Sequence, residues 1–206
     1  MPQIKQFIVQ FYRHLTICLL VTGLLILAAF PALSAKRVKN ETIEATAMGT
    51  GNQLGQNIGI SIEIYDYSTS EEKQLLVDAF NKGQNQGLVN ALTKMHAVGH
   101  ISVTGTLGYD LAFVHMIPTP TGRKIRFVTN RQLRFGEVWA DSQSTAFNLT
   151  AGELDVNDSD KSKSTGVMYP ECQLVIDKEG QLKIDLTQNA WKLVDVLDWK
   201  GTPGIN

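Results

Sequence analysis

The sequence predicts an α+β fold with a predominantly antiparallel β-sheet, either a sandwich or a curled barrel, into which a helical hairpin is inserted. Three observations lead to this prediction. Segments with a hydrophobic period of two follow one another along most of the chain, short polar turns join them, and residues 68–97 change to a helical period. No internal repeat or linker divides the rest. We therefore expect an export signal over residues 1–35 and a single α+β domain over residues 36–206.

The composition excludes several classes of protein. The chain has 206 residues, of which 43% are hydrophobic and 19% charged, and its formal net charge is -1. This balance is typical of a folded globular domain and argues against intrinsic disorder. It also argues against a strongly basic nucleic-acid-binding protein, so we expect no nucleic-acid partner.

The first 35 residues have the layout of an export signal. Lys5 and Arg13 precede the uncharged apolar run Leu15–Phe30, and small residues follow it where a signal peptidase would cut after Ser34. We therefore expect a secreted or periplasmic protein. The alternative is an anchor over residues 15–33 that stays in the membrane, because this run approaches the ~20 residues that span a bilayer.

Cysteine usage points to a domain without disulfides. If the leader is removed, Cys172 is the only thiol, so the hydrophobic core alone must hold the domain together. This favours a bacterial envelope protein over a disulfide-rich secreted module. Cys172 also alternates with Leu174 and Ile176, and we expect its thiol to be buried and unreactive.

Two strands are predicted at the start of the domain. In Asn57–Tyr67 four isoleucines alternate with polar residues or glycine, a pattern that indicates a half-buried strand. Glu41–Met48 is its predicted partner. The glycine-rich stretch Gly49–Gly55 connects them, and it lacks both the helix and the lysine that a nucleotide-binding loop requires.

Two short helices are predicted next. Ser68-Thr69-Ser70 is followed by two glutamates, which predicts a helix start with a capping box. This first helix is expected to end at Gly83, and a second is expected from about Gln86 to Ala97. The predicted buried residues are Leu75, Leu76, Ala79 and Phe80 in the first helix, and Leu88, Val89, Leu92 and Met95 in the second.

The remainder of the chain is predicted to form strands. Leu111–Ile117 is apolar at nearly every position, so we expect a central strand that is covered on both faces. Trp191–Trp199 fits a strand or a helix, and its valine and tryptophan content favours a strand. The other predicted strands are His100–Gly108, Lys124–Asn130, Gln132–Ala140, Ala146–Val156, Val167–Asp177 and Gln181–Leu186.

Candidate ligand-binding residues lie on two neighbouring predicted strands. Phe113 and His115 belong to the apolar strand, which is expected to line a pocket of the kind that barrels and sandwiches often enclose. Lys124 and Arg126 share a strand face in Arg123–Arg134, a hairpin with five basic residues and no acidic one. Such a face suits an anionic partner, or it keeps a sheet edge soluble.

The leading functional hypothesis is an exported, non-catalytic binding protein of the bacterial envelope. Its ligand would be an apolar small molecule or an anionic envelope component. One alternative is a secreted hydrolase that uses His115, His100 and Asp110. Another is a structural or interaction protein that uses the basic hairpin. No motif indicates a metal or a cofactor, and we expect neither.

Overall fold

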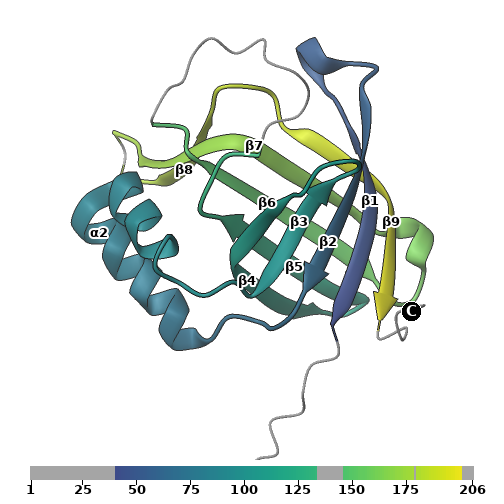
Figure 1. The fold of residues 1–206 in the computed structure, drawn as a ribbon, viewed down its shortest axis with the longest axis horizontal. Helices are drawn as coiled ribbons and strands as arrows, with labels where there is room; N and C mark the ends of the chain where they lie inside the picture. Colours follow the sequence, from purple (N-terminus) through teal and green to yellow (C-terminus); the bar gives the residue numbers. More distant parts are fainter. Residues whose placement is uncertain (1–39, 134–145, 179, 201–206) are drawn as a thin grey trace, which may run out of the picture. The chain divides into compact units, whose positions relative to one another are not determined.

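Eight antiparallel strands close into a barrel in the computed structural model of this chain, and a helix packs on the outside of the barrel (Figure 1). The structure describes residues 40–133, 146–178 and 180–200. Its strands are β1 (Glu41–Met48), β2 (Asn57–Ile64), β3 (Gly99–Val103), β4 (Tyr109–Thr119), β5 (Gly122–Thr129), β6 (Leu149–Asn157), β7 (Thr165–Ile176), β8 (Leu182–Leu186) and β9 (Trp191–Lys200). Its helices are α2 (Ser70–Leu92) and the 3-10 turns η2 (Gly51–Gln53) and η3 (Lys161–Lys163).

The barrel closes through strand β7. The strand order is β6-β5-β4-β3-β2-β1-β9-β7, and β7 pairs back onto β6. The first part of β7 pairs with both β6 and β9, whereas its last part, Cys172–Ile176, pairs with β8 on the side away from β6. Strand β8 therefore extends the sheet beside the barrel and is not one of the eight strands that close it.

Apolar side chains fill the interior of the barrel. Alternate residues of each strand point inward, as the period of two requires. In β2 these are Ile60, Ile62 and Ile64, and Phe127 and Trp191 are the largest of the fully buried residues. The ring of Phe127 lies against Gly152 on the adjacent strand, where an added Cβ would come within 2.3 Å of the ring. The lumen is thus a packed core.

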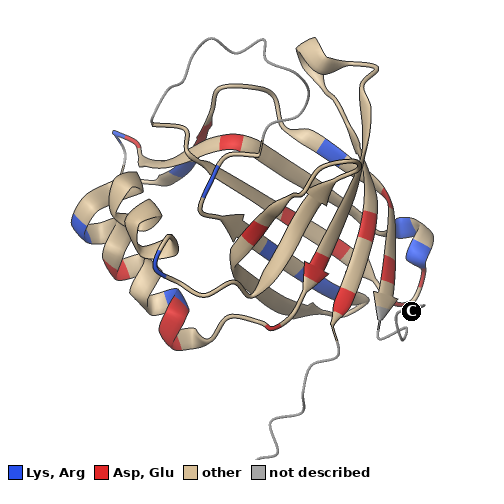
Figure 2. Ribbon diagram, in the orientation of Figure 1, with Lys and Arg blue, Asp and Glu red and all other residues tan. Residues whose placement is uncertain are grey.

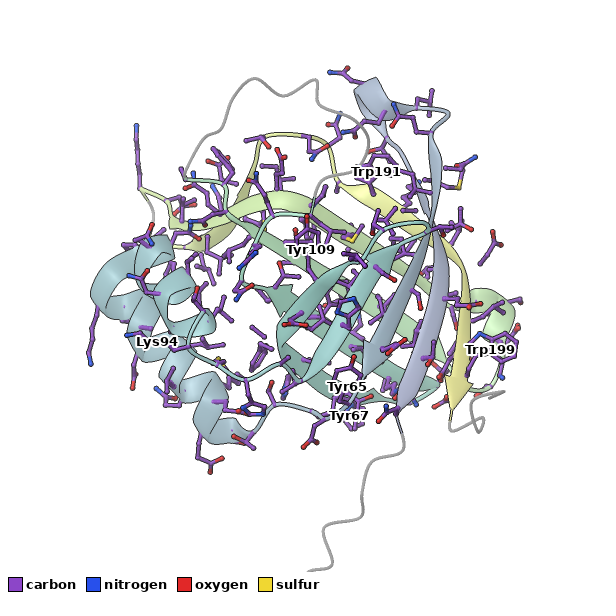
Figure 3. All side chains as sticks on the ribbon, viewed as in Figure 1. Tyr65, Tyr67, Lys94, Tyr109, Trp191 and Trp199 are labelled. Atoms are coloured by element: carbon purple, nitrogen blue, oxygen red, sulfur yellow. The ribbon has the colours of Figure 1, made fainter. Side chains whose placement is uncertain are left out.

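Buried charges tie three strands together at one end of the barrel. Arg123, at the start of β5, forms ion pairs across the barrel with Glu41 of β1 and with Asp198 of β9, the latter at 2.6 Å. Tyr67 donates a hydrogen bond of 2.8 Å to Glu41. Burial raises the pKa of the Glu41 carboxyl. Tyr67 and Trp191 lie at opposite ends of the barrel (Figure 3).

Helix α2 begins with the expected capping box. The Thr69 side chain accepts a hydrogen bond from the backbone N–H of Glu72 at 3.2 Å, and the Glu72 carboxylate accepts one from Thr69 at 2.7 Å. Five apolar residues of the helix face the outside of the barrel and form a second core with Ala112, Leu149 and Cys172; they are Leu76, Phe80, Leu88, Val89 and Leu92.

The helix folds back on itself at Gln84. This residue has a positive φ of 50° and a ψ of -145°, which breaks the helical path. Gly87 then lies directly against the chain before the break, because a Cβ at Gly87 would be 2.3 Å from the carbonyl oxygen of Ala79. The element α2 thus consists of two helical segments that meet at Gln84, between the predicted end of the first helix at Gly83 and the predicted start of the second at about Gln86.

Most of the predicted strands are confirmed, with shifted ends. Glu41–Met48 is β1 exactly as predicted, and Trp191–Lys200 is the strand β9. The second half of α2 ends at Leu92, earlier than the predicted Ala97, because the backbone turns there with bonds between residues three apart. The predicted strand Gln132–Ala140 falls almost wholly outside the described residues.

Two predictions about burial need correction. Leu75 was expected on the buried face of the helix, yet it is 51% exposed. The predicted cover on both faces of Leu111–Ile117 holds only for its first half, where Leu111 and Val114 face the lumen and Ala112 faces α2. Met116, near the end of β4, is 36% exposed although the register places it opposite the buried Ile125, on the same face of the strand as Val114.

Gly87 provides a test of the fold-back. We expect Gly87→Ala to lower the free energy of unfolding by about 1–3 kcal/mol, because the new methyl group overlaps the Ala79 carbonyl. The matched control is Gly83→Ala in the same helix, where nothing lies within 4 Å of the added Cβ. The control should be neutral or slightly stabilising in urea denaturation. Equal effects of the two substitutions would contradict the fold-back.

Candidate ligand-binding groove

A groove of about 710 Å³ lies between helix α2 and the outer face of the barrel. Its floor is the outer face of strands β4 to β7, and the β7–β8 hairpin borders it on the side away from the barrel. Most of the lining is apolar, because this is the part of the second core that α2 does not cover completely. The groove is open to solvent along one side and has the size of a small-molecule site.

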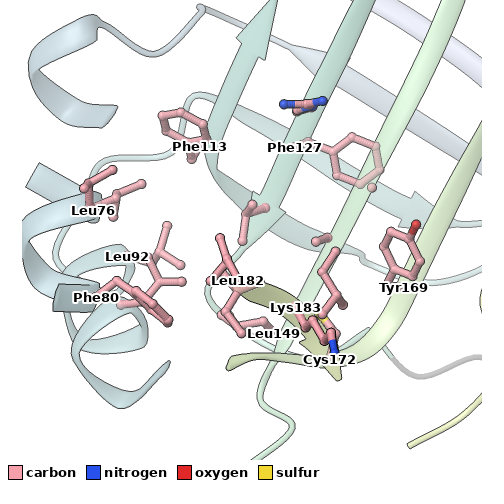
Figure 4. A pocket seen from close by; sticks show the side chains of 18 of the residues that line it. Leu76, Phe80, Leu92, Phe113, Phe127, Leu149, Tyr169, Cys172, Leu182 and Lys183 are labelled. Carbon is pink, nitrogen blue, oxygen red and sulfur yellow. The ribbon is translucent and has the colours of Figure 1, made fainter. Parts of the chain in front are cut away.

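Each wall of the groove contributes its own set of side chains (Figure 4). Leu76 and Phe80 come from α2, and Phe113 comes from β4. The strands β6 and β7 contribute the middle part of the groove floor, where Leu149 of β6 and Tyr169 of β7 are labelled in the figure. Leu182 of β8 faces these from the added hairpin. The groove therefore depends on α2 and β8 being held in place.

Asn85 fixes α2 against the barrel directly after the break in the helix. Its side-chain nitrogen donates hydrogen bonds to the Ala146 carbonyl at 3.1 Å and to Asn148 at 3.0 Å. Its side-chain oxygen accepts one from the backbone N–H of Leu174 at 2.9 Å. Because Leu174 also lines the groove, this buried amide joins the helix to the groove floor.

Paired charges stand at the rim of the groove. Glu153 accepts hydrogen bonds from Arg126 at 2.6 Å and from Lys124 at 2.9 Å, and these bonds lower the pKa of the Glu153 carboxyl. Lys183 of β8 pairs with Asp177 at 2.6 Å. Arg126, Glu153 and Lys183 all border the groove. A polar group on a ligand would find partners of both signs there.

The structure brings together the four residues that the sequence singles out. Phe113 and Arg126 line the groove. His115 stacks on Phe113 with ring centroids 6.1 Å apart and lies opposite Arg126 in the strand register. Lys124 reaches the rim through Glu153. They lie on the outer face of β4 and β5, however, and the expected pocket inside the barrel is replaced by the packed lumen.

Sequence reasoning missed the contribution of the helix and of the last strands. Leu76 and Phe80 were predicted to be buried, but periodicity gives no indication that they leave a groove beneath them. Cys172 was expected to be inert, and it lies in the groove lining at 1% exposure. Burial raises the pKa of its thiol to about 12. No local signal in the sequence connects these residues, which pack together only in the folded chain.

The basic hairpin is largely neutralised in the folded protein. Lys124 and Arg126 share the outer face of β5 as predicted, but the acidic residues Glu153 and Asp155 lie opposite them on β6. Arg123 is buried in the ion pairs at the barrel end. Figure 2 shows the acidic and basic residues interleaved on these strands. The prediction of a basic face missed acids that come from a distant part of the sequence.

The candidate hydrolase residues do not form a catalytic arrangement. His100 and Asp110 lie opposite each other on β3 and β4, with 3.4 Å between Nδ1 and the carboxylate. The other ring nitrogen of His100 is 2.8 Å from the Leu107 carbonyl oxygen, so both nitrogens are occupied by the β3–β4 turn. His115 is stacked on Phe113 instead. The geometry assigns His100 to the turn.

Two features are absent from the residues that the structure describes. No group of three or more histidine, cysteine, aspartate or glutamate side chains in this part of the chain is arranged to hold a metal ion. Over the same ranges, no helix combines the length and apolar character needed to cross a membrane.

Comparison with known proteins gives no relative. No protein-family model, no curated protein and no solved structure matches the chain significantly.

Cys172 reports on the enclosure of the groove. We expect its thiol, in a Cys18→Ser variant that leaves it as the only cysteine, to react at least about tenfold more slowly than an unfolded thiol at pH 7. The reason is that burial raises the pKa of the thiol from 9.0 to about 12 and so lowers its thiolate fraction, which outweighs the higher nucleophilicity of the thiolate that does form. The rate with a disulfide reagent, measured with and without denaturant, checks this. Equal rates in the two conditions would show that the thiol is not enclosed.

Asn85 is expected to be the main polar anchor of α2. Asn85→Ala removes three hydrogen bonds and leaves a buried N–H without its partner, so we expect a loss of about 1–3 kcal/mol of unfolding free energy. Amide exchange should also become faster in α2 than in the barrel strands. The control is Asn90→Ala on the exposed side of the same helix, with an expected change within about 0.5 kcal/mol. A uniform change in exchange over the whole domain would contradict the anchoring role.

Proposed function

We propose that this chain is an exported, non-catalytic binding protein that holds a small apolar molecule in the groove between α2 and the barrel. One observation carries the proposal: the groove of about 710 Å³ is lined mainly by aliphatic and aromatic side chains. Sites for small molecules in proteins have volumes of about 300–1,000 Å³ and the same kind of lining. The proposal of export rests on the leader-like pattern of residues 1–35.

The packed lumen supports a site on the outside. A ligand inside the barrel would have to displace residues such as Phe127, Leu154 and Trp191, which are at most 1% exposed. Displacing a packed core residue costs several kcal/mol. The groove requires no such displacement. Apolar surface that remains partly wet there would be buried by an apolar ligand, at about 25 cal/mol per Å².

The rim supports a ligand with at most a small polar group. Arg126 is hydrogen-bonded to Glu153, and Lys183 is paired with Asp177, so these two basic side chains at the rim already have acidic partners. Lys73 of α2 is the third basic residue of the lining and is exposed to solvent. A strongly anionic ligand would compete with these carboxylates, whereas an apolar ligand leaves the pairs intact. This argument favours the apolar small molecule over the anionic envelope component.

Native mass spectrometry of the protein purified from the envelope of its own cells tests this function. We expect an additional mass that is released on denaturation. Ala151→Trp places a large side chain on the groove floor, and it should abolish the additional mass and lower the affinity for a fluorescent apolar dye at least about tenfold. The matched control is Thr46→Trp on β1, an outward position that does not line the groove, and it should bind like the wild type.

Two outcomes would overturn the proposal. One is a wild-type protein that carries no additional mass and binds no apolar dye. The other is binding that Ala151→Trp and Thr46→Trp weaken equally, since this would place the ligand elsewhere. Recovery of the protein from the cytoplasmic fraction with its first 35 residues intact would overturn the export part alone.

A further inference from the structure

Strand β8 leaves an open edge on the sheet. The eight barrel strands all have neighbours on both sides, but β8 is the last strand in the sheet order and pairs with β7 alone among the described residues. An edge strand presents backbone N–H and C=O groups to any chain that can pair with it. Natural proteins usually protect such edges, which makes the composition of this one informative.

The side chains of β8 alternate between exposed apolar residues and the charged residues Lys183 and Asp185. Leu182 is 61% exposed and Ile184 is 42% exposed, so an apolar residue stands in the middle of the strand. The strand has no proline, and the register with β7 is continuous over all five residues, without a bulge. A strand that pairs with this edge must therefore match both its apolar and its charged positions.

The sequence of β8 is complementary to itself. Its five residues, Leu-Lys-Ile-Asp-Leu, are symmetric in character about Ile184. If two copies of β8 pair antiparallel with Ile184 opposite Ile184, then Lys183 lies opposite Asp185 and Leu182 lies opposite Leu186. Two opposite-charge pairs and apolar contacts can then form, with each Lys183 shared between Asp177 of its own copy, 2.6 Å away, and Asp185 of the second copy. Opposite charges facing each other across antiparallel strands are stabilising.

We propose that two copies of this chain associate through antiparallel pairing of their β8 strands, with Ile184 on the two-fold axis. The contact is isologous, since each copy gives the same residues, and it closes as a dimer. A one-residue shift of register places a charged residue opposite an apolar one, and a two-residue shift places like charges opposite each other, so the charge pattern also selects the register. The occupant of the edge is therefore a second copy rather than an unrelated peptide.

The two-fold axis brings the groove faces of the two copies onto the same side of the joined sheet. In an antiparallel pair the axis is perpendicular to the sheet, so faces do not exchange. Leu182 and Ile184 line the groove in each copy. The same residues of the second copy then extend the apolar wall beyond β8. Each copy adds apolar surface next to the other copy's groove.

Charge reversal tests the pairing. The full chain and its variants are purified in the same way and compared by sedimentation velocity over a range of concentrations. We expect a dimer for the wild type. Lys183→Asp and Asp185→Lys each place like charges opposite one another twice, and each should raise the dimer dissociation constant at least about tenfold. The double variant restores opposite charges and should return the dissociation constant to near that of the wild type.

Lys192→Asp controls for the change in net charge, because Lys192 is an exposed lysine of β9, away from the β8 edge. Its dissociation constant should match that of the wild type. A monomeric wild type at all concentrations overturns the proposal, whatever the variants do. So does a dimer that both single reversals leave unchanged, or a double variant that is no better than the single ones. Circular dichroism confirms that each compared variant is folded.

Discussion

The structure depends on strand β7 being longer than the barrel needs. Its first part pairs with β6 and β9 and closes the barrel, and its last part, Cys172–Ile176, continues beyond β9. This extension carries β8 as an added strand. It also supplies Leu174, whose backbone N–H holds Asn85 and hence the middle of α2. Barrel closure, the position of the helix and the groove thus share one backbone segment.

The packing of the lumen decides where a ligand can bind. A barrel of eight strands has an interior that side chains can just fill or that can hold one small ligand. Here the interior is filled, and Gly152 is needed for the purpose, because only a residue without a Cβ leaves room for the ring of Phe127. Helix α2 packs instead on the apolar residues of the outer face and buries them. It does not bury all of them, and the part left uncovered forms the groove.

The sequence predicts the local elements well because their signals are local. Ile60, Ile62 and Ile64 alternate, and the alternation alone places them on one face of a strand. The capping box at Thr69 likewise involves residues three apart. An antiparallel sheet and a helical insertion followed from such patterns. The prediction left open whether the sheet is a sandwich or a barrel, since closure depends on β6 and β7 pairing in space.

The site could be predicted only in part, because its determinants are far apart in the sequence. Phe113 and Arg126 were recognised from their own strands. Arg123 was counted with the basic hairpin because its partners, Glu41 and Asp198, lie 82 and 75 residues away. Glu153, which neutralises Arg126, comes from a different hairpin altogether. A single sequence shows each charge without its partner, so it overestimates the net charge of such a face.

Several ionisable side chains that could take part in binding or catalysis are instead paired within the fold. This leaves fewer surfaces that could carry the function. Arg123 and its acidic partners close one end of the barrel, and His100 is held by its turn. The groove and the β8 edge remain, and they share Leu182 and Ile184. A ligand that contacts these side chains would touch the strand whose edge we propose to pair with a second copy. Binding and self-association at this place would then be thermodynamically linked, and each would change the affinity of the other by the same factor.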